Sequence, residues 1–134
     1  MTSPTDLLHE ANAALLERGE HDDLGRFFTG GYVVHGTHGD RNAGHDGIRR
    51  FLRALAKAFS EVTVEVEVLS EGGDRLAWQR RVRCLHTGAF QGFPATGGAL
   101  VWRDMLVSRF EDGRIAEEWA VSDLAEQLLR ARKG

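Results

Sequence analysis

The second half of the sequence alternates between apolar and polar residues, and this period of two restricts the possible folds more than any other feature. In the first run, valines alternate with threonine and glutamate over residues 62–68. The same alternation predicts three further strands, at roughly residues 76–90, 98–110 and 114–123. Asp112-Gly113, between the last two, is a strong hairpin signal, because a type I′ turn needs a positive φ at both central positions. The pattern therefore predicts a long antiparallel sheet.

Helical patterns precede this sheet, and one follows it. Apolar residues recur at helical spacing in two segments, and Thr5 or Asp6 is placed to cap the first of them. The predicted elements are a helix ending near residue 18, a helical turn at 22–28, a strand at 32–35, a glycine-rich loop at 36–44, a helix at 46–59 and a last helix from residue 124. Helices that come before a long sheet must cover one of its faces. We expect an α+β fold, a cone-shaped curved antiparallel sheet covered by the N-terminal helices, with room inside for a ligand.

Length, charge and cysteine content narrow the class of protein. The chain has 134 residues, enough for one core, and no linker, so we expect a single domain over residues 1–134. Its formal net charge of −3 predicts no bulk attraction to nucleic acid or to an anionic membrane. No apolar run has the length of a transmembrane helix, and the single cysteine, Cys84, cannot form an internal disulfide. We therefore expect a cytoplasmic protein.

The hairpin turn fixes a register, and the register assigns side chains to the two faces of the sheet. Counting back from the turn sets Trp102 opposite Asp123, and a pairing of Asp104 with His86 keeps the faces of the preceding strand consistent. The predicted inner face carries Trp78, Arg80, Val82, Cys84, His86, Trp102, Asp104, Leu106, Ser108, Phe110, Ile115, Glu117, Trp119, Val121 and Asp123. The predicted outer face carries Arg81, Arg83, Arg103, Arg109 and Glu118.

Polar groups converge on this inner face. His86, Asp104 and Asp123 fall together at the end away from the turn, and diagonal neighbours across an antiparallel pair lie about 7–8 Å apart, within reach of a shared substrate. An apolar cavity with a few convergent titratable groups is a candidate active site. Each group has a structural alternative. Asp123 and Glu126 have the spacing of a helix-capping box, and His86 and Asp104 can satisfy one another.

Aromatic side chains would form the walls of this pocket. Trp78, Trp102 and Trp119 are predicted to face inward, and Phe51 lies on the apolar stripe of the helix over residues 46–59. Together they would bind a flat, apolar substrate, although tryptophans on an inner sheet face also serve as core. The expected partner is therefore a small apolar or aromatic molecule.

Two histidines close in sequence raise the question of a metal site. His35 ends the predicted early strand, where it would line the mouth of the pocket as a further catalytic group, and His38 follows shortly after. The residues between them, Gly36-Thr37, indicate a loop, and no third ligand is evident. We therefore expect no metal site.

Several motifs resemble those of one known family. They are His86-Thr87-Gly88, Gly92-Phe93-Pro94-Ala95-Thr96-Gly97, the run from Arg109 to Glu117, the following Trp119 and Asp123, and the early strand Tyr32-Val33-Val34-His35. These motifs are similar to those of the SnoaL-like polyketide cyclases of the nuclear-transport-factor-2-like superfamily. Ala95 departs from the pattern, since the family shows a second proline there.

The resemblance implies the cone-shaped α+β fold and a homo-oligomer, a dimer or tetramer. It implies metal-free and cofactor-free intramolecular aldol cyclisation of a polyketide-derived substrate, as in antibiotic biosynthesis, an activity of the isomerase or lyase class. Asp123 matches the family's pocket aspartate, which removes and returns a proton. The superfamily also includes hydrolases, dehydratases and isomerases, and a fold does not fix a reaction. A non-catalytic binding module for an apolar ligand is the alternative from another class.

Overall fold

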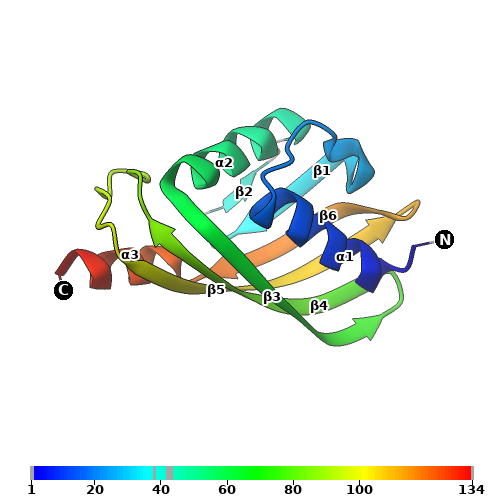
Figure 1. Ribbon diagram of the computed structural model, residues 1–134. Helices are drawn as coiled ribbons and strands as arrows, with labels where there is room; N and C mark the ends of the chain where they lie inside the picture. Colours follow the sequence, from blue (N-terminus) through cyan, green and yellow to red (C-terminus); the bar gives the residue numbers. More distant parts are fainter. Residues whose placement is uncertain (1, 38, 42–43, 134) are drawn as a thin grey trace.

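The computed structural model describes residues 2–37, 39–41 and 44–133. Within these residues a curved sheet of six strands, in the order β2-β1-β6-β5-β4-β3, forms the framework (Figure 1). Neighbouring strands pair antiparallel, except for β1 and β6, which run parallel. The strands are β1 (Phe28–Gly36), β2 (Gly39–Arg41), β3 (Phe59–Gly72), β4 (Arg75–His86), β5 (Ala99–Glu111) and β6 (Arg114–Ser122). The predicted sheet and the α+β class are confirmed.

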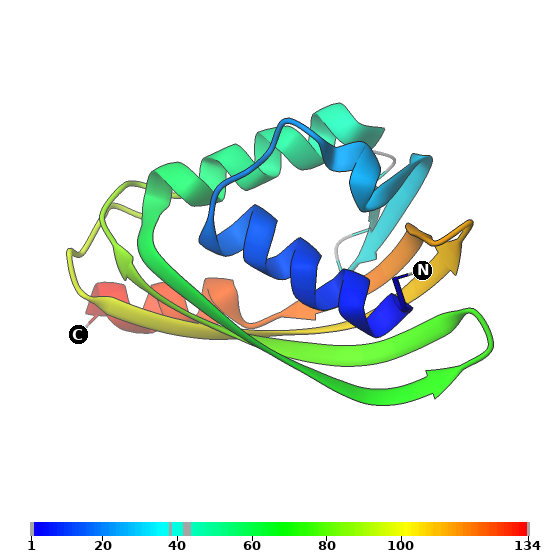
Figure 2. The same ribbon diagram turned by 45° about the vertical axis from the view of Figure 1, so that its right-hand side comes forward.

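Helices line one side of the sheet. They are α1 (Pro4–Asn12), the π-helical turn η1 (Ala13–Glu17), the 3-10 turn η2 (Leu24–Arg26), α2 (Gly44–Ala58) and α3 (Leu124–Lys133). In both views α1 and α2 lie over the concave face, and α3 lies along β5 beyond the end of β6 (Figures 1 and 2). Among the described residues, no helix is both long and apolar enough to cross a membrane.

The first helix begins where a serine caps it. The Oγ atom of Ser3 accepts a hydrogen bond of 3.1 Å from the backbone N–H of Asp6. The cap is therefore Ser3 and not the predicted Thr5 or Asp6, because Pro4 occupies the first helical turn, where its missing N–H costs nothing. The helix extends nearly as far as predicted, but residues 13–17 form a π-helical turn that its spacing did not predict.

The β5–β6 hairpin contains the predicted turn and an unpredicted bulge. Its two turn residues have φ values of 52° and 76°, as a type I′ turn requires. Phe110 pairs with Ile115 as expected, but one extra residue then enters β6, so that Arg109 pairs with Glu117. Because side chains alternate along a strand, this slip of one residue moves every later side chain of β6 to the opposite face.

The bulge corrects the predicted faces of β6. Glu117, Trp119, Val121 and Asp123 were expected inside the cone. The register places Glu117, Trp119 and Val121 on the outer face, and Asp123 follows the end of β6. Glu118 was expected outside, and it is buried opposite Ser108 on β5. The predicted meeting of three polar groups at one end of the inner face is therefore wrong.

The pairing of β4 with β5 preserves the predicted faces but not the predicted partners. Asp104 lies opposite Arg80, six positions along β4 from the predicted partner His86. An even shift leaves the inner and outer sets unchanged, so Trp78 and Trp102 are buried inside as predicted. His86 lies about 20 Å further along the strand, at ~3.3 Å per residue, and is far from Asp104.

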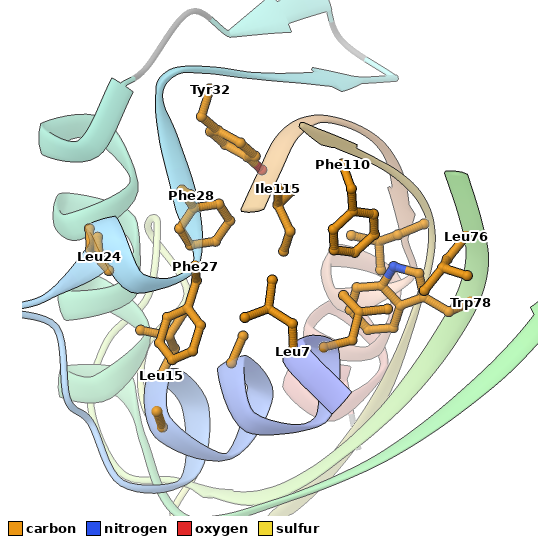
Figure 3. Packing of buried hydrophobic residues seen from close by; sticks show 14 of the residues in the cluster. Leu7, Leu15, Leu24, Phe27, Phe28, Tyr32, Leu76, Trp78, Phe110 and Ile115 are labelled. Carbon is orange, nitrogen blue, oxygen red and sulfur yellow. The ribbon is translucent and has the colours of Figure 1, made fainter. Parts of the chain in front are cut away.

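Side chains from α1 and η1 fill much of the space between the helices and the sheet. Leu7 and Leu15 point from this segment into a cluster that includes Phe27 and Ile115 (Figure 3). A cavity of about 20 Å³ remains between η1, α2 and the sheet, lined in part by Trp102. A volume of that size holds about one water molecule. The cone is therefore present, but packed side chains occupy the space that we expected for a ligand.

Candidate functional site

A glutamate is buried on the inner face of β6, directly after the bulge. Glu118 is 6% exposed. Its Oε1 atom accepts a hydrogen bond of 2.5 Å from the phenol of Tyr32, and its Oε2 atom accepts one of 2.5 Å from the hydroxyl of Ser108. The Oγ atom of Ser108 accepts a further hydrogen bond, of 2.8 Å, from the indole N–H of Trp78. Tyr32 reaches across from β1 (Figure 3), so side chains from several strands fix one carboxyl group.

An ion pair lies next along the inner face. The Nε atom of Arg80 donates a hydrogen bond of 2.7 Å to Oδ2 of Asp104, and its Nη1 atom donates one of 2.9 Å to Oδ1 of Asn12. The same carboxylate oxygen accepts a hydrogen bond of 3.3 Å from the indole N–H of Trp102. The side chains of Arg80 and Asp104 are 20% and 9% exposed. This pair therefore joins the end of α1 to β4 and β5.

The surroundings of Glu118 perturb its ionisation. Burial raises the pKa of this carboxyl above its ordinary value, because the charged form loses its hydration. The hydrogen bonds from Ser108 and Tyr32 and the positive charge of Arg80 lower the pKa, but they only partly offset burial. Burial and the neighbouring Glu118 also raise the pKa of Tyr32, so that its phenol remains a hydrogen-bond donor.

The chemistry of these groups is complementary. A carboxyl group with a raised pKa can take and return a proton near neutral pH. A guanidinium group held by two partners, as in Arg80, can stabilise negative charge that develops on a nearby oxygen. We call Glu118, Tyr32, Ser108, Arg80 and Asp104 the buried polar network. It has the groups needed for proton transfer next to a carbonyl.

The predicted catalytic residue Asp123 lies just beyond β6, and both of its carboxylate oxygens bind groups outside the buried polar network. Its Oδ1 atom accepts a hydrogen bond of 2.7 Å from the backbone N–H of Arg103, and its Oδ2 atom accepts one of 3.2 Å from the amide of Gln127. These contacts attach the start of α3 to β5. The side chain of Glu126 forms an ion pair with Arg130 at 2.9 Å. It therefore does not bond back to the start of the helix, as a capping box would require.

His35 and Trp119 lie together on the outer face. Their rings stack with centroids 5.2 Å apart, and the guanidinium carbon of Arg75 lies 4.8 Å from the centroid of the Trp119 ring. The Nε2 atom of His35 lies 2.6 Å from Glu117, which also accepts a hydrogen bond of 2.9 Å from Arg109. The bonds from His35 and then Arg109 lower the pKa of Glu117. The predicted pocket roles of His35 and Trp119 therefore have no support from their positions.

The remaining predicted residues divide between inside and outside. Trp78 and Trp102 are buried and each donates a hydrogen bond within the inner face. Phe51 is 41% exposed, whereas its neighbour Leu52 is buried. The helix α2 is thus rotated so that Phe51 lies at the edge of its apolar stripe. His86 is buried, but the structure does not bring it to Asp104.

Metal-ligating side chains do not gather in the part of the chain that the structure describes: it contains no group of three or more His, Cys, Asp or Glu side chains placed to hold an ion. His38, one of the two histidines considered for such a site, lies outside the described residues. Burial raises the pKa of the Cys84 thiol to about 11, which keeps it protonated and unreactive.

Reasoning from the sequence missed the residue at the centre of the network. Glu118 was assigned to the outer face because alternation was counted without interruption from the hairpin turn. The available signal was the adjacent pair Ile115-Ala116, since two neighbouring apolar residues break a period of two. Both are buried, as residues on either side of a bulge can be.

Solved structures with the same fold include several bacterial proteins. AclR from Streptomyces galilaeus, a proposed hydroxylase, is 24% identical, with a TM-score of 0.82 and coverage of 97% of this chain and 96% of that one. IdmH from Streptomyces antibioticus, a proposed polyketide cyclase, is 23% identical, with a TM-score of 0.80 and coverage of 98% and 99%. A SnoaL-like polyketide cyclase from Agrobacterium tumefaciens is 22% identical, with a TM-score of 0.77 and full coverage of both chains, 100% each.

These identities establish a shared fold and leave the reaction open. A search of curated proteins finds no match. The family model of the SnoaL-like polyketide cyclases matches residues 6–130, which includes most of α1, the whole sheet and most of α3. The chain belongs to the SnoaL-like polyketide cyclase family.

Proposed function

We propose that the protein is a small-molecule enzyme that uses general acid/base chemistry, with Glu118 as the group that transfers the proton. The observation that carries this proposal is the buried Glu118 carboxyl, whose pKa is raised by burial while Tyr32 and Ser108 hold both of its oxygens. The reaction that fits the family best is the intramolecular aldol cyclisation of an apolar, polyketide-derived substrate. It requires one proton to be taken and one to be returned, which a single carboxyl can do.

The steps balance without a redox change. The Glu118 carboxylate takes a proton from a carbon that lies between two carbonyl groups, leaving an enolate. The enolate carbon attacks a second carbonyl of the same molecule, so a C–C bond forms and the carbonyl π bond becomes an alkoxide. Glu118 then returns its proton to that alkoxide. Arg80 is positioned to stabilise the negative charge on oxygen, because its guanidinium is already fixed by Asp104 and Asn12.

A hollow on the surface lies beside β1, β5 and β6, which carry part of the buried polar network. It has a volume of about 260 Å³ and lies where β1 separates from β6 between Phe28 and Val33. Gly31 and Ala116 line it, and they directly precede Tyr32 and the Glu117-Glu118 pair in the chain. We propose that the substrate approaches through this hollow.

A pair of glycine variants tests this route. A Cβ atom at Gly31 would meet nothing within 4 Å, so Gly31→Leu should fill the hollow without a clash. It should lower kcat/KM by about tenfold or more, as expected when a substrate contact region is blocked, while the melting temperature changes little. Gly30→Leu is the matched control, because Gly30 is also unobstructed but does not line the hollow. Equal kinetics for the two variants would rule out this route.

Three carboxyl variants test the reaction. The assay follows ring closure of linear β-keto esters that carry an internal ketone, with products identified by mass and NMR. Glu118→Gln should lower turnover by about 10²-fold or more, as expected for loss of a general base. Glu117→Gln, one residue away on the outer face, and Asp123→Asn should retain turnover. Full activity in Glu118→Gln would remove Glu118 from the mechanism. If neither the intact protein nor any variant closes the ring, the cyclase assignment is refuted.

The outer face of the sheet suggests how copies of the chain associate. Met105 and Val121 lie opposite one another on β5 and β6, and each is 49% exposed. Val101, on the same face of β5, is 38% exposed. We propose that this apolar strip is buried in a homodimer, because solvent-exposed pairs of large apolar side chains on a sheet favour association. Sedimentation should show a dimer that Met105→Glu dissociates, and a monomeric protein would contradict the proposal.

A further inference from the structure

A histidine is buried at the far end of the inner face without the hydrogen bonds it needs. His86 is 1% exposed, and among residues 2–37, 39–41 and 44–133 neither Nδ1 nor Nε2 has a hydrogen-bond partner. A buried imidazole carries one donor or two and normally finds partners for them, because an unmet polar group loses its hydration without compensation. Unpaired atoms of this kind point to a partner that binds here.

The surroundings of His86 are aromatic. Its ring centroid lies 5.2 Å from that of Phe59, which in turn lies 5.4 Å from Phe90 and 5.1 Å from Trp102. All four rings are buried. Tilted rings at these separations favour a further flat ring among them. The chemistry of the site is therefore that of an aromatic compound with one group able to hydrogen-bond an imidazole.

A loop covers this end of the sheet. The loop between β4 and β5 stands beside the end of α2 and above α3 (Figure 1). Its first residues are anchored, since the backbone N–H groups of Thr87 and Gly88 both donate to the carbonyl of Ala58 at 2.9 Å. Within residues 89–99, Phe90 is the one buried side chain, and Phe93 is partly buried. Phe90 is therefore the main apolar contact of the cover, in addition to the hydrogen bond from the backbone N–H of Gly97 to the carbonyl of His86.

The balance between the closed and open cover is close. Closing buries the apolar ring of Phe90, which is favourable, but it also encloses both nitrogens of His86, for which the described residues offer no hydrogen-bond partner. These two contributions oppose one another and are of similar size. The loop turns at Gly92 and Gly97, both at positive φ, and its far end is tied to β4 because the backbone N–H of Gly97 donates to the carbonyl of His86 at 2.8 Å.

We propose that residues 89–97 form a removable cover over a second binding site, in which a flat phenol takes the position of the Phe90 ring and its hydroxyl group bonds to His86. The phenol satisfies one ring nitrogen, and the other becomes reachable by water when the cover opens. This site does not depend on the proposed reaction, because His86 lies six positions along β4 from Arg80. It binds its ligand by stacking and one hydrogen bond.

Two probes that differ by one hydroxyl group test the site. Affinities of 2-naphthol and naphthalene are measured by NMR titration, with the imidazole ¹⁵N signals of His86 as the reporter. Intact protein should bind 2-naphthol about tenfold more tightly, the value of one neutral hydrogen bond, and the His86 signals should shift. In His86→Phe, and in His86→Leu should the first fail to fold, the two probes should bind equally.

A second prediction concerns the cover itself. Phe90→Ala removes the ring that competes with the ligand, so it should bind both probes several-fold more tightly than the intact protein does. Melting curves establish that each variant is folded. Unchanged His86 signals at saturating 2-naphthol in Phe90→Ala would overturn the proposal. So would a crystal structure in which an ordered water satisfies His86 and the naphthol lies elsewhere.

Discussion

Glu118→Gln should make the protein's stability less dependent on pH, and the buried geometry sets the sign. In the folded chain Glu118 has a pKa above its ordinary value because burial penalises its charged form. Above the unfolded pKa the folded state therefore binds more protons than the unfolded state does. The stability that Glu118 contributes is fully present at low pH and is lost as pH rises toward its folded pKa. Glutamine does not titrate, so this loss disappears in the variant.

The size of the effect follows from proton linkage. Each pH unit between the unfolded and folded pKa values corresponds to about 1.4 kcal/mol. Between these two pKa values the variant should therefore gain stability relative to the intact protein as pH rises. The amide of glutamine offers one acceptor oxygen where the carboxylate offers two, so one of the hydrogen bonds from Tyr32 and Ser108 is lost, at a cost of about 1 kcal/mol. The pH dependence of the stability difference, and not its absolute size, identifies the titration.

Urea unfolding at a series of pH values measures this slope, and Glu117→Gln is the matched control. Glu117 is adjacent in sequence but lies on the outer face, where His35 and Arg109 lower its pKa. Its contribution to stability is present above its unfolded pKa and is lost as pH falls, so its variant should differ from the intact protein at neutral pH and converge with it in acid. A stability difference for Glu118→Gln that does not change as pH rises above the unfolded pKa of about 4.3 would refute the argument that burial governs its ionisation.

Two further substitutions test the network and the cover. Asp104→Asn should lower the free energy of unfolding by about 3 kcal/mol, near the lower limit for breaking a buried ion pair, because Arg80 is partly exposed. In urea unfolding, the double variant Arg80→Met with Asp104→Leu should recover most of this loss. If the single and double variants lose the same stability, the two side chains are not coupled. Gly88→Ala would place a Cβ atom 2.3 Å from the carbonyl oxygen of Lys57, so it should destabilise the fold by about 1–3 kcal/mol. Backbone amides of the β4–β5 loop should then exchange their hydrogens faster. A neutral effect on both would mean that this loop is not tightly anchored.

The sequence predicted the elements well and the faces of β6 poorly, for one local reason. Alternation and the Asp112-Gly113 turn were sufficient for the strands, because both signals are short in range. The inner face of β6 depended on an uninterrupted count from the turn, and one extra residue near Ala116 reversed it. The count therefore assigned Asp123 to the inner face and Glu118 to the outer face. No propensity marks such a bulge strongly, since it forms where β1 joins the sheet from a distant part of the chain.

The interior illustrates a second limit. A curved sheet under helices was expected to enclose an open pocket, but the volume inside depends on how far α1 penetrates. Its buried residues include Leu7 and Leu8, and the cavity left between η1, α2 and the sheet is about 20 Å³. Periodicity shows which side of a helix is apolar, and it does not show how closely that side approaches the sheet. Packing distance is a tertiary property and had to come from the structure.

Glu118 is a buried carboxyl, and we expect it to hold its proton more tightly than an ordinary glutamate does. Carboxyl ¹³C NMR, with the Glu118 signal assigned by its absence in Glu118→Gln, follows this group directly through a pH titration. The midpoint for Glu118 should lie above the ordinary glutamate value of about 4.3, and the midpoint for Glu117 should lie below it. A Glu118 signal that titrates at or below about 4.3 would contradict this expectation, since such a carboxyl would be ionised and solvated like any surface glutamate.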